Sequence, residues 1–421
     1  MLNFYWVYLI LEIFNYIYYN YIKSFILNNN YYYGNRFDLI VRNNFIQKNN
    51  NQIKFITEYI NFKKTVNINI NEFNFNSICK FLLSLYFNKS LKQVDHKHLK
   101  IIYEDIIFIS NKYKIKLNNK IKLYKYGKSD IKCFYKPIFI SFLLTFIKYY
   151  YEIKLKLNGF NKYKSRHTNI CYWYKMNKNK NIPLIFIHGL GFGIIPYLDY
   201  IIDISKEITI ICPVLPNISN TYFHPFKFYF NKNDFFPNFN LINEELINIL
   251  NIHKIKKINI MAHSFGTFIL SSLMLSRKFR KRINLKIFVD PVCFHSNFIK
   301  TIKAVDLFKM NEKQKLISIL LHYFIYLDIY VKYATKRNLF TMEFLWGNYK
   351  YLDNDTIIVL SENDNICGSF EIYDDINKYG FNHIIEWLPN ANHGDLFLTD
   401  NWKNILLEIK NKLFISPPPK I

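Results

Sequence analysis

The chain has 421 residues, of which 50% are hydrophobic and 19% aromatic, and this composition excludes a disordered chain and a small disulfide-stabilised protein. Charged residues make up 21% and the mean hydropathy is −0.05, values that exclude a polytopic membrane protein. Lysine and arginine number 56 against 31 aspartates and glutamates. The resulting net charge of +25 suggests either a nucleic acid or an anionic membrane as a partner.

The basic residues are almost all lysines. Only seven are arginines, and asparagine, isoleucine, tyrosine and phenylalanine are also abundant, as expected when A/T-rich codons bias the whole composition. A protein that reads bases would favour arginine, because its planar guanidinium matches guanine and phosphate. We therefore predict that the protein does not bind nucleic acid.

The six cysteines are widely scattered, and no two of them have the spacing of metal ligands or of a disulfide framework. The sequence thus predicts neither a metal site nor redox chemistry. The cysteines are Cys79, Cys133, Cys171, Cys212, Cys293 and Cys367.

Residues 1–27 form the first predicted element, an aromatic and apolar stretch that Glu12, Asn15 and Asn20 interrupt. A helix that spans a bilayer needs about 20 mainly apolar residues, and a carboxylate at its centre costs roughly 2.5–3.5 kcal/mol. Trp6 and six tyrosines prefer the membrane–water boundary. Two interpretations stay open: a membrane anchor, spanning or interfacial, and a buried amphipathic helix.

Residues 28–165 carry no motif that predicts a function. We expect this region to be helical, with asparagine- and lysine-rich loops such as 43–51 and 113–128. The apolar run at 137–151 is too short to span a bilayer before Lys148, and it predicts a core or interfacial helix.

Beyond about residue 166, short β-branched runs alternate with helical stretches. Mostly apolar strands separated by helices predict a parallel sheet that helices cover on both faces. Ligands of such sheets bind outside the carboxyl ends of the strands, which is where polar residues follow the predicted strands. The predicted strands are 182–187, 208–214, 257–261, 285–289, 356–360 and 384–388, and the predicted helices include 241–250, a segment that ends at 275, and 402–413.

Ser264 lies between a predicted strand and a predicted helix, in the sequence Ala262-His263-Ser264-Phe265-Gly266. A sharp turn from strand to helix exposes the middle side chain and needs small residues two positions before and after it. Ala262 stands where glycine is more usual, and Gly266 fits. A helix N-cap is the alternative role for Ser264, but a cap does not need small neighbours on both sides. We expect His263 to support the turn.

A serine hydroxyl becomes a nucleophile when a base takes its proton and an acid orients that base. Asp364 and His393 follow Ser264 in chain order, each just beyond a predicted strand. We predict that His393 is the base and Asp364 the acid. Asp290 ends the preceding strand and is the alternative acid, and we expect His188 to be structural.

The stretch 166–415 resembles the α/β-hydrolase family, in its serine hydrolase branch of esterases and lipases. The resemblance implies a mostly parallel sheet and an oxyanion hole formed by the backbone N–H groups of Leu190 and Phe265, donors worth about 2.7–4 kcal/mol each. It also implies that no metal or organic cofactor takes part. The residues that carry the resemblance are His188-Gly189, the turn at Ser264, Asp364-Asn365-Ile366 and His393-Gly394.

A helical lid is predicted at 294–350, inserted between two strands where members of this family can carry one. The apolar stretch 316–331 predicts a lid helix, either buried on the hydrolase core or presenting an apolar face to lipid. Both interpretations predict an apolar entrance to the site.

The predicted function is hydrolysis of a carboxylic ester or thioester with an apolar acyl group, through an acyl-enzyme. An acyltransferase with the same triad and a membrane-associated, non-catalytic binding scaffold are the alternatives. If Ser264, His393 and Asp364 lie within hydrogen-bond reach, the enzyme is favoured over the scaffold. The expected partner is a small-molecule or lipid ester, with location at a membrane or otherwise in the cytoplasm, and the oligomeric state is open.

Overall fold

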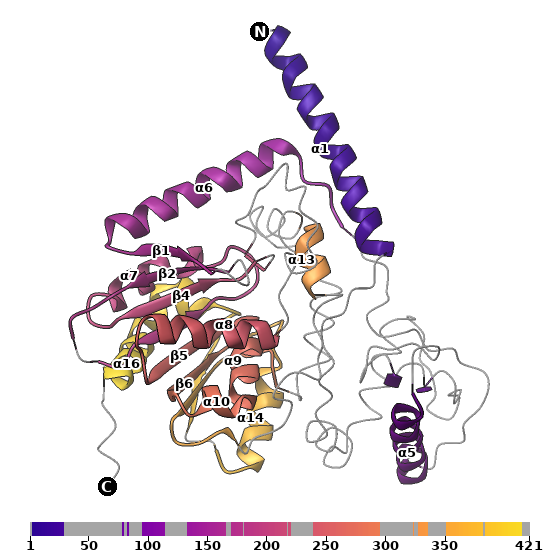
Figure 1. The fold of residues 1–421 in the computed structure, drawn as a ribbon. Helices are drawn as coiled ribbons and strands as arrows, with labels where there is room; N and C mark the ends of the chain where they lie inside the picture. Colours follow the sequence, from indigo (N-terminus) through magenta and orange to yellow (C-terminus); the bar gives the residue numbers. More distant parts are fainter. Residues whose placement is uncertain are drawn as a thin grey trace.

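An eight-stranded β-sheet forms the centre of the part of the chain that the structure, a computed structural model, describes (Figure 1). The described residues are 2–28, 78–79, 82–83, 95–113, 133–165, 170–179, 181–216, 218–219, 239–294, 323, 327–335, 351–381 and 384–414. The strands are β1 (Asn161–Lys164), β2 (Cys171–Lys175), β3 (Leu184–Ile187), β4 (Ile210–Val214), β5 (Ile258–His263), β6 (Ile283–Val289), β7 (Thr356–Ser361) and β8 (Ile385–Leu388).

The strand order across the sheet is β1-β2-β4-β3-β5-β6-β7-β8. Strands β3 to β8 pair in parallel, while β1 with β2 and β2 with β4 pair antiparallel at one edge. The six predicted strands are confirmed as β3 to β8. The strands β1 and β2 were not predicted, and β1 is a short, polar and exposed edge strand without an apolar run.

Successive side chains of the central strands enter two different apolar clusters. In β3, Leu184 and Phe186 belong to one cluster, and Ile185 and Ile187 belong to the other. Because both faces are buried, the central strands are nearly continuous apolar runs instead of alternating ones.

Helices cover both faces of the sheet, as predicted (Figure 1). One face is covered by α8 (Phe239–Ile252), α9 (Gly266–Leu275) and α14 (Ser369–Lys378), and the other by α6 (Ile138–Leu157), α7 (Leu198–Ile204) and α16 (Lys403–Phe414). The shorter and outlying elements are α1 (Leu2–Asn28), α5 (His96–Tyr113), η3 (Ile195–Tyr197), α10 (Arg277–Arg280), α13 (Ile329–Tyr333), α15 (Asp395–Leu398) and η11 (Asp400–Trp402).

The apolar run predicted as a helix forms α6, and its second half packs on the sheet. Tyr151 of α6 and Phe160 after it are buried in the same cluster as Trp173 of β2. The sheet itself begins at Asn161, a few residues before the predicted boundary at 166. Part of the core around the sheet therefore comes from the region to which the sequence assigns no function.

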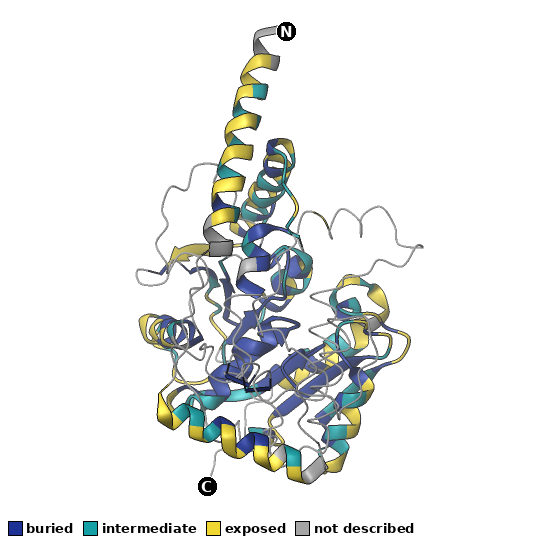
Figure 2. Cartoon of the chain, turned by 90° about the vertical axis from the view of Figure 1, so that its right-hand side faces the viewer, coloured by how far each residue is buried: buried dark blue, intermediate teal, exposed yellow. Residues whose placement is uncertain are grey.

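Nearly all of the predicted element 1–27 lies in the helix α1 (Leu2–Asn28), and much of the described surface of this helix is exposed (Figure 2). Glu12, which interrupts its apolar run, faces α6 and accepts a hydrogen bond from the backbone N–H of Ile138, 3.1 Å away. None of the helices in the described ranges combines the length and the apolar character needed to cross a membrane. The transmembrane interpretation of residues 1–27 is therefore not supported.

The predicted lid at 294–350 lies mostly outside the described residues, as does most of its apolar stretch 316–331. Within it, the structure describes 327–335, which contains α13. The predicted loops 43–51 and nearly all of 113–128 also lie outside the described residues.

Candidate active site

Ser264 occupies the turn between β5 and α9, with a backbone φ of 51°. A non-glycine residue in this left-handed region costs about 1–3 kcal/mol, so the surrounding structure must impose the conformation. The N–H of Ser264 donates to Val289 O at 3.0 Å, and the Ser264 carbonyl accepts from the N–H of Thr267 at 2.9 Å. These two hydrogen bonds attach the Ser264 turn to the end of β6 and to the first turn of α9.

The space around Gly266 explains why this position must be small. A Cβ atom there would lie 2.5 Å from the carbonyl oxygen of Ile187 and 2.9 Å from that of His188. Ala262, by contrast, is an ordinary residue of β5, paired in register with Ile187 and fully buried. The close approach therefore lies on the helix side of Ser264, and alanine on the strand side is accommodated.

The structure brings Ser264, His393 and Asp364 together. His393 Nε2 lies 2.8 Å from Ser264 Oγ, and His393 Nδ1 lies 2.6 Å from Asp364 Oδ2. The Oδ1 atom of Asp364 accepts from the backbone N–H groups of Ile366 and Cys367, both at 2.7 Å. The carboxylate is thus held with its second oxygen toward the imidazole.

The environment of His393 favours its charged form. Burial alone would lower its pKa, but attraction to Asp364 and the hydrogen bond between them outweigh burial and raise the pKa above the ordinary 6.5. A raised pKa makes the imidazole a stronger proton acceptor. This is the property that a base acting on a serine hydroxyl needs.

Asp290, the alternative acid, is fully buried at the end of β6 but does not bond His393 Nδ1. Its Oδ2 accepts from the N–H of Gly394 at 2.7 Å, and its Oδ1 accepts from the N–H of Ser361 at 3.1 Å. Burial raises its pKa, but the interactions with His263, His393 and Gly394 leave it lower than usual. Asp290 therefore joins the loops after β7 and β8 as a buried carboxylate.

His263, which precedes Ser264, lies between the loop after β3 and Asp290 at the end of β6. Its Nδ1 lies 2.7 Å from the hydroxyl of Tyr197, which itself accepts from the N–H of Gly189 at 3.2 Å. His263 Nε2 lies 3.6 Å from Asp290 Oδ2. The side chain supports the turn, as expected, while Tyr197 has no sequence motif that would have identified it.

His188 is buried and neutral. Its Nε2 accepts from the N–H of Leu215 at 3.0 Å, so its Nδ1 carries the proton and donates to Gly189 O at 2.7 Å. Burial lowers its pKa to about 4. These bonds connect the loop after β3 to the end of β4, a structural role.

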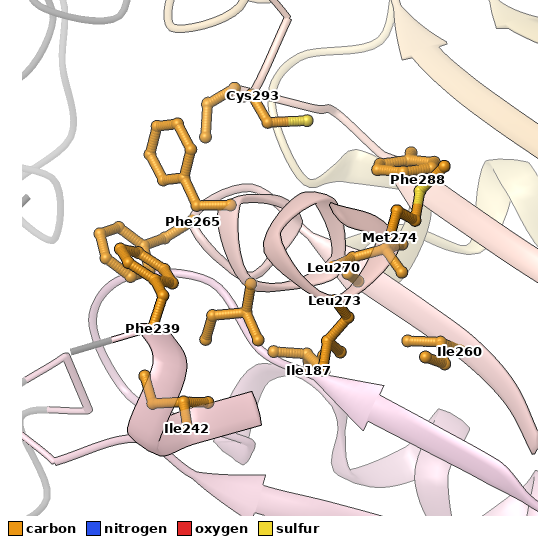
Figure 3. Packing of buried hydrophobic residues seen from close by; sticks show 14 of the residues in the cluster. Ile187, Phe239, Ile242, Ile260, Phe265, Leu270, Leu273, Met274, Phe288 and Cys293 are labelled. Atoms are coloured by element: carbon orange, nitrogen blue, oxygen red, sulfur yellow. The ribbon is translucent and has the colours of Figure 1, made fainter. Parts of the chain in front are cut away.

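The two expected oxyanion donors lie beside this arrangement. Leu190 follows Gly189, at which a Cβ atom would lie 3.1 Å from Ser264 Cβ. Phe265 is the N-cap residue of α9 and follows Ser264 directly. Figure 3 shows Phe265 at the start of α9, near Phe239 of α8 and Cys293, which follows β6.

Two sets of side chains have metal-ligand atoms within 4.8 Å of one another: His263, Asp290 and His393, and Asp364, Cys367 and His393. Both sets share His393, whose ring nitrogens face Ser264 and Asp364 at hydrogen-bond distance. Hydrogen bonding within the site accounts for both groupings, and we assign no metal to them. The absence of a cofactor stays a prediction.

The chain matches no protein-family model and no curated protein sequence. Its structure is similar to that of a bacterial membrane phospholipase A, with 12% identity, a TM-score of 0.45 and coverage of 65% of this chain and 92% of that one. It is similar to the carboxylesterase CesB from Bacillus subtilis, with 13% identity, a TM-score of 0.45 and coverage of 65% and 98%. It is also similar to a naproxen esterase from Bacillus subtilis, with 13% identity, a TM-score of 0.43 and coverage of 63% and 96%.

The sheet has the strand order β1-β2-β4-β3-β5-β6-β7-β8 with an antiparallel second strand, and a strained turn at Ser264 follows β5. Asp364 follows β7 and His393 follows β8, so the three side chains that meet all come from the carboxyl ends of parallel strands. The protein therefore has the α/β-hydrolase fold.

Proposed function

We propose that the protein is a serine hydrolase that cleaves a carboxylic ester or thioester with an apolar acyl group. The observation that carries the proposal is the hydrogen-bonded chain from Ser264 Oγ through His393 to Asp364, with Ser264 on a strained turn. This geometry supports an enzyme over a non-catalytic scaffold, because a binding surface alone does not need a base aligned on a serine hydroxyl.

In the first half-reaction, Ser264 Oγ attacks the carbonyl carbon while His393 Nε2 takes the hydroxyl proton. Asp364 stabilises the imidazolium that forms. The N–H groups of Leu190 and Phe265 bind the oxyanion of the tetrahedral intermediate. His393 then gives the proton to the leaving alcohol or thiol, and the acyl group stays on Ser264.

In the second half-reaction, His393 deprotonates a water molecule, which attacks the acyl-serine. The carboxylic acid leaves and Ser264 recovers its proton. An alcohol in place of the water would transfer the acyl group by the same steps, so the acceptor decides between hydrolysis and transfer.

Apolar side chains at the carboxyl ends of the strands support an apolar acyl group. Phe265 adjoins Ser264, Ile218 lies after β4, and Val292 and Phe294 lie after β6, all of them buried in one cluster. These four side chains carry no charge, so this edge of the sheet favours an apolar acyl group over a charged one.

Labelling with a fluorophosphonate probe tests the proposal. We expect the wild-type protein to be labelled and Ser264→Ala to be unlabelled. Ser276→Ala, at the other end of α9, is the matched control and should be labelled normally. Undiminished labelling of Ser264→Ala would refute the assignment, and esters of graded chain length then define the acyl preference.

A further inference from the structure

The outward face of α6 is apolar along its whole length. Its side chains recur at helical spacing, and several are among the most exposed apolar groups of the described chain, with Phe146 at 73% and Leu157 at 82% exposure. The opposite side carries the buried residues of the helix. A surface helix normally turns its apolar stripe toward the core. Besides that stripe, α6 has a second one that faces away from the core. The outward residues are Phe139, Phe142, Leu143, Phe146, Tyr149, Tyr150, Ile153 and Leu157.

The outward side of α1 has the same character. Glu12 and Lys23 are the only charged residues of this 27-residue helix. Figure 1 shows α1 passing the N-terminal end of α6 and extending beyond it, away from the sheet. Its exposed large side chains are Trp6, Val7, Tyr8, Ile10, Ile13, Phe14, Tyr16, Ile17 and Tyr21.

Glu12 and Asn15, two polar residues that interrupt the apolar run of α1, have hydrogen-bond partners within the protein. Glu12 accepts from the Ile138 N–H at the start of α6 and from the Tyr135 hydroxyl. Asn15 Nδ2 donates to the Tyr135 hydroxyl at 2.9 Å and to Lys136 O at 3.2 Å. Groups that already have hydrogen-bond partners cost far less to remove from water. Glu12 and Asn15 therefore join α1 to the segment that begins α6, while Asn20 donates to Tyr16 O within α1.

The residue types change in order along α6. Positions 139–147 contain no charged residue, Lys148 then precedes Tyr149 and Tyr150, and after Glu152 the last turn carries Lys154 and Lys156. The exposed strand β1 adds two more lysines. Lys154 pairs with Asp199 and Lys162 with Glu152, while Lys156 is exposed. Proteins that bind a membrane surface place residues in this order: apolar groups enter the acyl region, tyrosines lie at its boundary, and lysines lie at the anionic headgroups.

We propose that the outward residues of α1 and α6 form a docking face that binds the surface of an anionic phospholipid bilayer. The N-terminal part of α6 and the outward side of α1 enter the acyl boundary, and the lysines at the far end of α6 and on β1 lie at the headgroups. The second half of α6 packs on the sheet, so docking holds the hydrolase domain at the membrane. The proposal does not depend on chemistry at Ser264.

Flotation of the full chain with vesicles tests the docking face. We expect binding to phosphatidylcholine vesicles that contain phosphatidylserine and much weaker binding to phosphatidylcholine alone. Phe139→Asp combined with Phe146→Asp should weaken binding at least about tenfold, because two exposed rings lose their burial in lipid. Ile252→Asp combined with Leu407→Asp is the matched control, because both apolar residues are more than half exposed and lie on other helices, α8 and α16, and this variant should bind like the wild type.

Thermal unfolding checks that each variant is folded, and fluorophosphonate labelling reports separately on the active site. Failure of labelling with intact vesicle binding would refute the proposed function and leave the docking face standing. The docking proposal would be overturned if the wild type does not float, if it floats equally with both vesicle types, or if the Phe139/Phe146 variant floats like the control. Dimers that the same variant disrupts, without vesicle binding, would instead assign the face to a second copy of the chain.

Discussion

Asp290 accepts a hydrogen bond from the backbone N–H of Gly394 at 2.7 Å, and this bond ties the end of β6 to the loop that carries His393. The same carboxylate accepts from the N–H of Ser361 at the end of β7. Two carboxylates thus position His393 in different ways: Asp364 contacts its ring, and Asp290 binds the N–H of the next residue, Gly394. Their separate roles can be measured.

Asp364→Asn should slow fluorophosphonate labelling by about 10³–10⁴-fold, because an amide cannot stabilise the imidazolium. The amide oxygen can still accept from Ile366 and Cys367, so the fold should persist. Asp290→Asn should slow labelling less than about tenfold and lower the free energy of unfolding by about 1–3 kcal/mol, since one buried backbone N–H loses its acceptor. Labelling rates and urea unfolding measure both effects. If Asp290→Asn slowed labelling more than Asp364→Asn does, Asp290 would be the acid that acts on His393.

Tyr197→Phe should lower the free energy of unfolding by about 1–3 kcal/mol, because the Gly189 N–H and His263 Nδ1 both lose their partner. We expect labelling to slow about tenfold, since the loop of Leu190 loses its anchor. Tyr200→Phe is the matched control, because the buried Tyr200 hydroxyl has no hydrogen-bond partner in the described structure. Equal effects of the two substitutions would contradict the role of Tyr197.

Gly266→Ala should destabilise the protein by about 1–3 kcal/mol and slow labelling about 100-fold, because its Cβ would press on the Ile187 carbonyl and move Ser264. Ala262→Gly should cost only about 0.5–1 kcal/mol through chain entropy and leave labelling near the wild-type rate. Thermal unfolding and labelling of the pair check this asymmetry. A strong effect of Ala262→Gly would contradict it.

The pH dependence of labelling should follow His393. The base acts when neutral, so labelling should rise with pH through a midpoint above 6.5, since attraction to Asp364 raises the pKa of His393. Stability has the opposite sign: a raised pKa stabilises the fold at low pH, and this contribution is lost as pH rises through the folded-state pKa. A labelling midpoint below 6.5 would contradict the role of Asp364.

His188 predicts a second pH effect, on stability alone. Its folded-state pKa is lowered to about 4 from 6.5, so the unfolded chain takes up a proton first as the pH falls. The free energy of unfolding should decrease by about 3 kcal/mol between these two pH values. His188→Gln removes the proton site and should flatten the dependence in urea unfolding measurements, although it weakens the fold above pH 6.5. An unchanged slope would show that His188 is not the group responsible.

The sheet and the candidate triad were predictable because their signals are local. Each central strand is a mostly apolar run. Ser264 follows β5 directly, and Asp364 and His393 follow β7 and β8 within about five residues. Parallel strands bring their carboxyl ends to one edge, so three positions far apart in sequence meet.

The contacts of Asp290, Tyr197 and Glu12 could not be predicted in the same way. Asp290 and Asp364 both follow strands, and only the three-dimensional geometry distinguishes the carboxylate that contacts the imidazole from the one that holds its loop. Tyr197 comes from a segment without a motif. Glu12 bonds Ile138, more than a hundred positions along the chain, so its neighbours reveal nothing of that partner.

The packing of α6 sets a practical limit on where the chain can be shortened. A recombinant fragment that starts at 166 would lack β1 and would remove Tyr151, Leu155 and Phe160 from around Trp173. Such a fragment would expose that tryptophan and leave β2 as an unprotected edge prone to aggregation. A fragment that starts before Pro137 keeps these side chains, and it also keeps the outward aromatic face of the helix, so detergent belongs in its purification buffer.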